Sequence, residues 1–330
     1  MEEFIGKKTM RNLFRIYLLY LILFINITFW SCDSKIEPFS KISGKLPSPN
    51  DSTIVFVTMG VGLGWHIAVS YDYKKIYNLS LGIFDINAYW SPDKKWLVYN
   101  RIIPEQGHNL QLWRMQFDGS GKQGIILPPY DCGAAKISSD GSKIVFASPI
   151  DEINQILVSN SFGQNIQQIT NKDIFPSIKN AWYDLPSWSS DGQNILFTYG
   201  HSEPDSNSSF FFSLASINLP TKAITVYSSV DTMYPHNAQW SPVRDEIVFV
   251  GKAYPAAQIY RINTDGTGLR KLTDGDIASF PDWSSDGEYI IYDQPENSND
   301  KRSIWVMDRN DNNKRKLISI EGQDCTQPVW

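Results

Sequence analysis

Histidine and cysteine are scarce in this chain of 330 residues, which contains 4 and 3 of them respectively. So few histidines leave little material for a multi-histidine metal centre. Beyond Cys32, only Cys132 and Cys325 remain to form a disulfide. The patterns Gly-x-Ser-x-Gly, His-Glu-x-x-His and Cys-x-x-Cys do not occur. The sequence therefore lacks these signatures of hydrolases, zinc proteases and thiol oxidoreductases, and it predicts neither a metal nor a cofactor.

Charged residues are also sparse, at 20% of the chain with a formal net charge of −5. This balance argues against a nucleic-acid-binding surface, which requires a basic patch. Apolar residues make up 42% and aromatic residues 13% of the chain, including 11 tryptophans. Disordered chains show the opposite composition, with low hydrophobicity and high net charge. The length and apolar content therefore indicate a globular protein with a large core.

The first 32 residues differ from the rest of the chain. Arg11 and Arg15 precede an apolar run, Ile16–Trp30, and Ser31-Cys32 follows it. A basic region, an apolar region and a small residue are typical of a secretory signal, and the run is shorter than the roughly 20 residues of a membrane-spanning helix. The Ser-Cys pair resembles a bacterial lipoprotein signal, which implies lipidation of Cys32. An ordinary cleaved signal or an uncleaved anchor is the alternative.

A repeat dominates the remaining sequence. "YWSPDKKWLVYN", "KISSDGSKIVFAS", "SWSSDGQNILFTYG", "QWSPVRDEIVFVG" and "DWSSDGEYIIYD" are copies of one pattern, and "PSPNDSTIVFVT" is a sixth copy without its Trp. The central serines are Ser48, Ser91, Ser138, Ser189, Ser241 and Ser284, with spacings of 43, 47, 51, 52 and 43 residues. A period in the forties is typical of a β-propeller.

Each copy predicts four short strands. A segment ending in Trp meets a Ser-Pro or Ser-Asp-Gly turn, whose residues favour a tight hairpin. An apolar run, an alternating strand and a short polar strand follow, as in Lys143–Ala147, "AQIYRINTDGTG" and "LRKLT". Four strands per repeat without helical periodicity predict an all-β fold, a six-bladed β-propeller of four-stranded antiparallel blades.

The final residue predicts how the ring closes. Trp330 follows Trp283 by 47 residues, so "CTQPVW" is the first strand of a further copy. The copy at Ser48 lacks that strand. Joined together, the two pieces make one complete blade, and the C-terminal strand is expected to pair with the N-terminal blade.

The segment "IYRINTDGTGLRKLTDGDIASFPDWSSDGEYIIYD" carries a specific family resemblance. It resembles the WD40-like repeat (PD40) of the TolB β-propeller family, and similar repeats occur in prolyl-oligopeptidase-type peptidases. The resemblance covers about residues 48–330 and implies a stand-alone propeller without TolB's preceding α/β domain. The expected organisation is a signal peptide at 1–31, a tether at 32–47 and a propeller at 48–330.

The repeat also assigns residues to two rims. Asp93, Asp140, Asp191 and Asp286 belong to the serine turns on one rim, where we expect them to cap their own backbone. The opposite rim carries aromatic and polar loop residues near the channel mouth, which are typical of a ligand or partner site. The candidate residues are Trp65, His66, Asn87, Trp182, Tyr183, Asp184, Tyr234, His236, Asn237, Tyr254 and Phe280. The alternative is that these aromatics fill gaps between blades.

These observations favour a non-catalytic binding or scaffolding protein of the bacterial cell envelope. The expected protein is a monomeric propeller, held at the membrane through a lipid anchor only, on the periplasmic or cell-surface side. The resemblance implies an envelope protein as partner, and the aromatic rim would equally suit a glycan. The alternatives are a channel-centred lyase or hydrolase using Asp184 and His236, or an accessory propeller that gates a separate catalytic subunit. Cys132 and Cys325 are predicted to stay unpaired, because their blades are too far apart.

Overall fold

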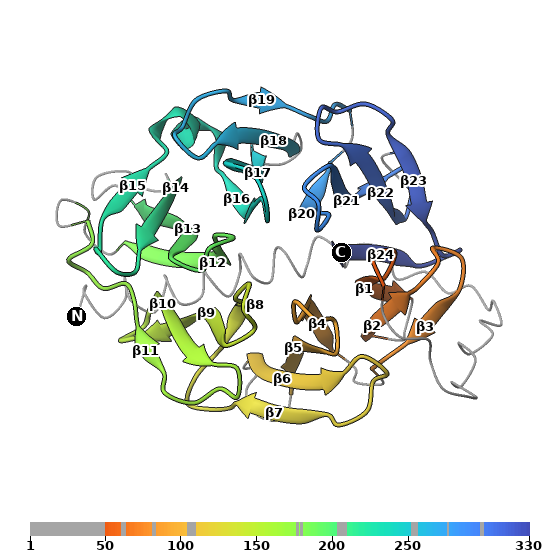
Figure 1. The fold of residues 1–330 in the computed structure, drawn as a ribbon, viewed down its shortest axis with the longest axis horizontal. Coiled ribbons are helices and arrows are strands. Elements are labelled where there is room, and N and C mark those ends of the chain that lie inside the picture. Colours follow the sequence, from red (N-terminus) through yellow and green to blue (C-terminus); the bar gives the residue numbers. More distant parts are fainter. Residues whose placement is uncertain are drawn as a thin grey trace, which may run out of the picture. The chain divides into compact units, whose positions relative to one another are not determined.

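The propeller is visible in a computed structural model, which describes residues 50–60, 64–80, 84–103, 110–175, 178, 181–202, 210–251, 257–275, 277–297 and 300–330. All of them belong to one compact unit, Ile42–Trp330. They form six antiparallel sheets of four strands each, arranged in a ring (Figure 1). The predicted six-bladed propeller is confirmed. Cys32 and the predicted signal and tether lie outside the described residues.

Each sheet is one blade, and its four strands follow one another from the channel outward. Blade 1 contains β24 (Asp324–Val329), β1 (Ile54–Gly60), β2 (Gly64–Ser70) and β3 (Ile76–Asn78). Blade 2 contains β4 (Asp85–Trp90), β5 (Trp96–Ile102), β6 (Leu110–Gln116) and β7 (Gln123–Ile126). Blade 3 contains β8 (Gly133–Ile137), β9 (Lys143–Ile150), β10 (Ile153–Asn160) and β11 (Gln167–Gln168).

The second half of the ring repeats this order. Blade 4 contains β12 (Trp182–Trp188), β13 (Asn194–Ser202), β14 (Phe210–Asn218) and β15 (Ile224–Val226). A 3-10 helix, η2 (Ser228–Met233), leads to blade 5, with β16 (His236–Trp240), β17 (Glu246–Gly251), β18 (Gln258–Asn263) and β19 (Arg270–Lys271). Blade 6 contains β20 (Ser279–Trp283), β21 (Tyr289–Pro295), β22 (Arg302–Asp308) and β23 (Arg315–Ile318).

The C-terminal strand closes the ring as predicted. In Figure 1 the dark blue β24 lies beside the orange β1, and the two pair antiparallel, with Val57 opposite Thr326. Blade 6 holds β24 from the other side. Asp293 accepts hydrogen bonds from the Thr326 hydroxyl and from the Gln327 amide at 3.0 Å. The first and last described strands are therefore joined in one blade, which removes two open sheet edges.

The core is divided among six hydrophobic clusters, each lying between two neighbouring blades. A fully buried aromatic ring stands eight residues after each central serine, on the second strand of its blade. These rings belong to Phe56, Tyr99, Phe146, Phe197, Phe249 and Tyr292. Tryptophans at the ends of inner strands also link blades, since the Trp188 indole donates to the Lys136 carbonyl at 3.2 Å. Burial between blades therefore holds the ring together.

A β-bulge occurs in the inner strand of every blade, opposite the buried aromatic ring. The inner-strand register shifts there, so that two residues face one on the second strand. One residue of each bulge has a left-handed φ: Asn87 (52°), Ala134 (47°), Leu185 (50°), Asn237 (49°), Phe280 (50°) and Gln327 (52°). A bulge bends its strand and redirects the side chains that follow it.

The serine turns cap their own backbone, as predicted. Asp140 accepts hydrogen bonds from the Ser138 hydroxyl at 2.6 Å and from the Ser142 amide at 3.0 Å. These bonds lower the pKa of Asp140 to about 2. Asp93, Asp191 and Asp286 make the same pair of bonds. The turn aspartates are therefore structural, and blade 5, which has Val243 at this position, leaves the buried Ser241 hydroxyl without a partner among the described residues.

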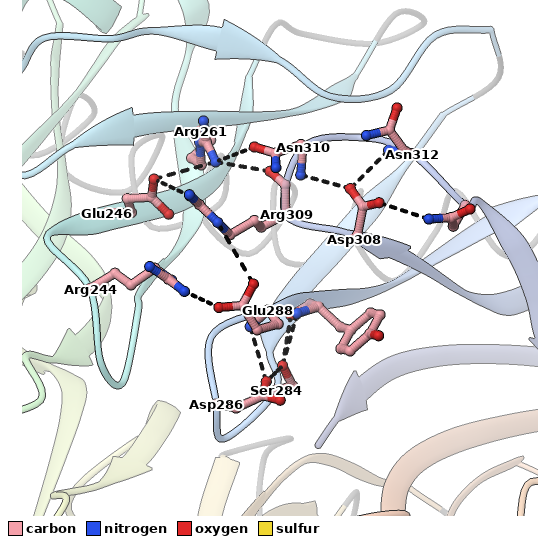
Figure 2. Close-up of polar contacts among 12 residues, drawn as sticks. Arg244, Glu246, Arg261, Ser284, Asp286, Glu288, Asp308, Arg309, Asn310 and Asn312 are labelled. Carbon is pink, nitrogen blue, oxygen red and sulfur yellow. Dashed lines mark hydrogen bonds and ion pairs between the residues drawn. The ribbon is translucent and has the colours of Figure 1, made fainter.

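A group of ion pairs joins blades 5 and 6 on the rim of the serine turns (Figure 2). Glu246 accepts from Arg309 at 2.7 Å and lies 3.3 Å from Arg261. Arg261 also donates to the Arg309 carbonyl at 2.9 Å. Arg244 pairs with Glu288 across the same junction. Each arginine of this group pairs with a glutamate, so we infer that these ion pairs hold blades 5 and 6 together.

Candidate functional site

Aromatic side chains gather on the rim opposite the serine turns, where β12 and β16 begin. The rings of Trp182 and Phe212 meet edge to face, with centroids 5.8 Å apart. Phe212 and Tyr234 follow at 6.0 Å. We call Trp182, Phe212 and Tyr234 the aromatic row. Tyr234 is 39% exposed, so the row presents apolar surface to solvent. Phe211, which precedes Phe212 in β14 and therefore points to the other face of that strand, is 40% exposed.

Local backbone features place this row. A Cβ on Gly200 would lie 2.3 Å from the Trp182 ring, so only glycine lets that ring lie on β13. Tyr234 has a left-handed φ of 50° at the end of η2. The sequence did not predict η2, and it did not single out Phe211 or Phe212. The run "SSFFFSLAS" was the available signal, because it combines strand-forming residues with more aromatic rings than one sheet face can bury.

Asp184 and His236 occupy equivalent positions at the start of the inner strands of blades 4 and 5. One oxygen of Asp184 accepts from the Leu185 amide at 2.7 Å and the other from Asn154 at 3.5 Å. Burial raises the pKa of Asp184 to about 6. The Nδ1 of His236 lies 2.9 Å from the Tyr234 carbonyl oxygen, and burial lowers the pKa of this imidazole. The carboxyl and the imidazole stand near the aromatic row, and each is held by its own neighbours.

Three of the predicted site residues form bulges. Asn87, Asn237 and Phe280 are the left-handed residues of their inner strands. The backbone NH of Asn87 donates to the Gln327 side chain at 2.8 Å, and its side-chain amide donates to Asn100 at 3.2 Å. Asn87 therefore connects blades 1 and 2.

Other predicted site residues do not line the mouth of the channel. Tyr183 is fully buried and its hydroxyl donates to the Asn171 carbonyl at 3.1 Å, so it belongs to the blade core. Trp65 and His66 were expected in a loop but lie in β2, and Trp65 packs edge to face on Phe84 at 6.1 Å. Alternating β-strand geometry turns Trp65 inward, where it is 9% exposed. Tyr254 lies outside the described residues.

Cys132 and Cys325 are unpaired, as the sequence predicted, and both are buried. Cys132 packs between blades 2 and 3, and Cys325 between blades 6 and 1. Burial raises the pKa of both thiols, that of Cys325 to about 12. Protonated, buried thiols are poor nucleophiles, so they act as small apolar core residues.

Metal-binding clusters and membrane spans are both missing from the part of the chain that the structure describes. No three or more His, Cys, Asp or Glu residues of the described ranges are placed together so as to hold a metal ion. Within the same ranges, no helix is long and apolar enough to cross a membrane.

Comparison with known structures agrees with the propeller fold. TolB from Acinetobacter baumannii matches with a TM-score of 0.67 at 14% identity, over 86% of this chain and 67% of that chain. A TolB from Agrobacterium tumefaciens matches with a TM-score of 0.61 at 16% identity, over 83% and 96%. An oligogalacturonate lyase in complex with manganese matches with a TM-score of 0.52 at 16% identity, over 82% and 77%. Identities this low show a shared fold alone.

Sequence comparison gives the family. No curated protein sequence matches the chain. The family model of the TolB β-propeller domain (PD40) matches residues 126–330. This range begins at the last residue of β7 and covers blades 3 to 6 and β24, which is more than half of the 330 residues. The chain therefore belongs to the TolB β-propeller domain family.

Proposed function

We propose that this propeller is a binding module of the bacterial cell envelope, and that a protein partner docks on the aromatic row. The observation that carries the proposal is the exposure of Tyr234 in a row of packed rings, together with the exposure of Phe211 next to Phe212 in the sequence. Aromatic residues are enriched at protein interfaces, where they contribute much of the binding free energy. The rings are already packed against one another, so binding needs little further ordering of side chains. Export and lipid attachment at Cys32 are part of the same proposal.

Asp184 and His236 complement the row. They lie beside it on the same two blades and provide polar groups at the edge of an apolar surface. A polar margin around an aromatic centre is the usual anatomy of a protein interface.

The test uses two exposed aromatics whose removal leaves the core intact. A photo-crosslinking residue at position 211, in cells of the native host, is expected to capture a specific protein. Phe211→Ala with Tyr234→Ala should then weaken the purified complex by at least about 30-fold in titration calorimetry, as expected for a pair of interface anchors. Phe162→Ala is the matched control, because Phe162 is 62% exposed on the opposite rim.

Two results would count against this proposal. One is a complex whose affinity is the same for the double variant and the wild type. The other is capture of envelope glycan fragments by the row with no protein cross-link, which would replace the protein partner with a glycan.

A second candidate, an enzyme, is favoured by Asp184 and His236. Burial raises the pKa of Asp184 to about 6, which brings this carboxyl closer to neutral pH. Burial lowers the pKa of His236, which keeps the imidazole neutral, as a general base requires. If the site is catalytic, manganese with an oligogalacturonate should raise the melting temperature of the wild type, and His236→Ala should abolish that rise. An unchanged melting temperature in the wild type would remove this candidate.

A further inference from the structure

A layer of six residues, five of them polar, surrounds the channel directly after the six bulges. In five blades, the residue of this layer lies two positions before the central serine. In β24 it is the residue directly before Trp330, which is the equivalent position. The layer consists of Tyr89, Lys136, Ser187, Gln239, Asp282 and Val329. The inner strands that carry them lie at the centre of the ring (Figure 1). This layer lies toward the serine turns, away from the aromatic row.

Three of these side chains, which come from blades 2, 3 and 6, influence one another electrostatically. Burial raises the pKa of Tyr89, and the Asp282 charge raises it further. Burial lowers the pKa of Lys136 to about 8, and the Asp282 charge opposes that change. Blades 2 and 3 do not adjoin blade 6, and blade 3 stands opposite it in the ring (Figure 1). Their electrostatic interaction therefore acts through the channel.

The Lys136 ammonium has no anionic partner in the described part of the chain. Its Nζ lies 5.3 Å from the centroid of the Tyr89 ring, which provides a cation–π contact. No hydrogen bond or ion pair of Nζ occurs among the described residues. An unpaired charge inside a protein is unfavourable unless another group compensates it.

Asp282 is the opposite charge of the layer. It is 8% exposed, and one of its oxygens accepts from the Trp330 amide at 3.1 Å. The Lys94 charge favours the ionised form of Asp282. However, the Nζ of Lys94 donates to the Asn50 carbonyl at 3.0 Å, so this ammonium is held at the turns. The Trp283 amide also donates to this carboxylate. A carboxylate can accept about four hydrogen bonds, so Asp282 keeps acceptor capacity. Among the described residues no ion pair joins it to Lys136.

Neutral polar groups complete the layer. The Ser187 hydroxyl donates to Gln239 at 3.2 Å, and this pair comes from blades 4 and 5. The channel therefore has a cation with an aromatic ring on one side, a carboxylate on the opposite side, and hydrogen-bonding groups between them.

We propose that this layer binds a small zwitterion, such as an α-amino acid or a short peptide. The carboxylate of the ligand would pair with Lys136 and its ammonium group with Asp282, while Ser187 and Gln239 provide hydrogen bonds. A zwitterion compensates both charges of the layer at once, whereas a simple anion or cation leaves one of them without a partner. This site is separate from the aromatic row, so the proposal does not depend on the proposed protein partner.

The test is titration calorimetry of the full chain with L-alanine and L-alanyl-L-alanine, with acetate and methylammonium as single-charge controls. We expect heat of binding with at least one zwitterion and none with either control at the same concentration. Lys136→Met and Asp282→Asn should each weaken binding by at least about tenfold, because each removes a charge-assisted hydrogen bond. The matched variants Lys143→Met and Asp245→Asn change exposed residues and should bind as the wild type does.

The pH profile provides a second measurement. Burial raises the pKa of Asp282 to about 6, and Lys136 has a pKa of about 8. Binding needs the carboxylate and the ammonium together, so the affinity for L-alanine should be highest between these values and fall on either side. Tyr89 and Lys94 are the other titratable groups that face Asp282. Burial raises the pKa of Tyr89, away from this range, and burial lowers the pKa of Lys94.

The melting temperature of each unliganded variant shows that it is folded. We expect Lys136→Met and Asp282→Asn to remain folded, because Met and Asn are close in size to the side chains that they replace. Folded variants that bind L-alanine or L-alanyl-L-alanine as the wild type does would overturn the proposal. An absence of binding by both zwitterions to the wild type would overturn it as well.

Discussion

Removal of residues 324–330 is expected to lower the melting temperature by about 10 °C or more, which far exceeds the effect of trimming an ordinary tail. The deleted segment contains all of β24, which pairs with β1. It buries Cys325 completely and leaves Thr326 8% exposed. Lost burial and broken hydrogen bonds together cost at least about 5 kcal/mol of unfolding free energy. That loss is comparable to the whole stability of many domains.

The loss follows from ring closure. Without β24, blade 1 has three strands, and β1 exposes an unpaired edge beside blade 6. Asp293 also loses its hydrogen bonds from Thr326 and Gln327. Scanning calorimetry measures the change. A synthetic peptide of residues 319–330, added to the truncated chain, should restore part of the melting temperature. If the truncated chain melts like the full-length chain, the ring does not depend on this closure.

Asp293→Ala is expected to lower the unfolding free energy by about 3–5 kcal/mol, the usual cost of leaving one member of a buried ion pair alone. Asp293 is fully buried and pairs with Arg302, whose Nε lies 2.8 Å from its carboxylate. The same carboxylate holds Thr326 and Gln327 of β24. One side chain therefore pairs with a partly buried guanidinium and fastens the closing strand. Denaturant titration gives the free energy.

Asp85→Ala provides the matched control for this prediction. Asp85 is also fully buried and pairs with Arg101 at 2.7 and 2.8 Å, and in the described part of the chain its carboxylate forms no hydrogen bond with β24. Both variants should be destabilised. Only Asp293→Ala should also speed hydrogen exchange at the amides of β24, because Asp293 accepts from that strand and Asp85 does not. Equal exchange in the two variants would show that Asp293 does not fasten β24.

The serine turns were predictable because their contacts are local. Ser138 and Asp140 bond to each other and to a backbone amide within a few residues. Such turns recur wherever the same short pattern recurs, so their positions could be read without a structure. The pattern also placed Trp330 one repeat after Trp283 and thereby predicted the closure by β24.

The candidate site was less predictable, because contacts between distant residues form it. The aromatic row was found in part: Trp182 and Tyr234 were predicted, whereas Phe212, which joins them, lies on a different strand from either. Tyr183 was predicted at the mouth but is fully buried, since successive residues of a strand point to opposite sides. A repeat alignment gives the height of a residue along the channel but not the direction of its side chain.

By itself, the sequence determined the fold family, the number of blades, the turns and the closing strand, because each depends on short patterns repeated at a regular spacing. Only the tertiary structure decided the rest. The bulges fall on residues as different as Ala134, Leu185 and Phe280, since the buried ring opposite imposes the left-handed backbone there. Lys136 and Asp282 are 146 residues apart in the sequence, and only closure of the ring brings them to opposite sides of one channel.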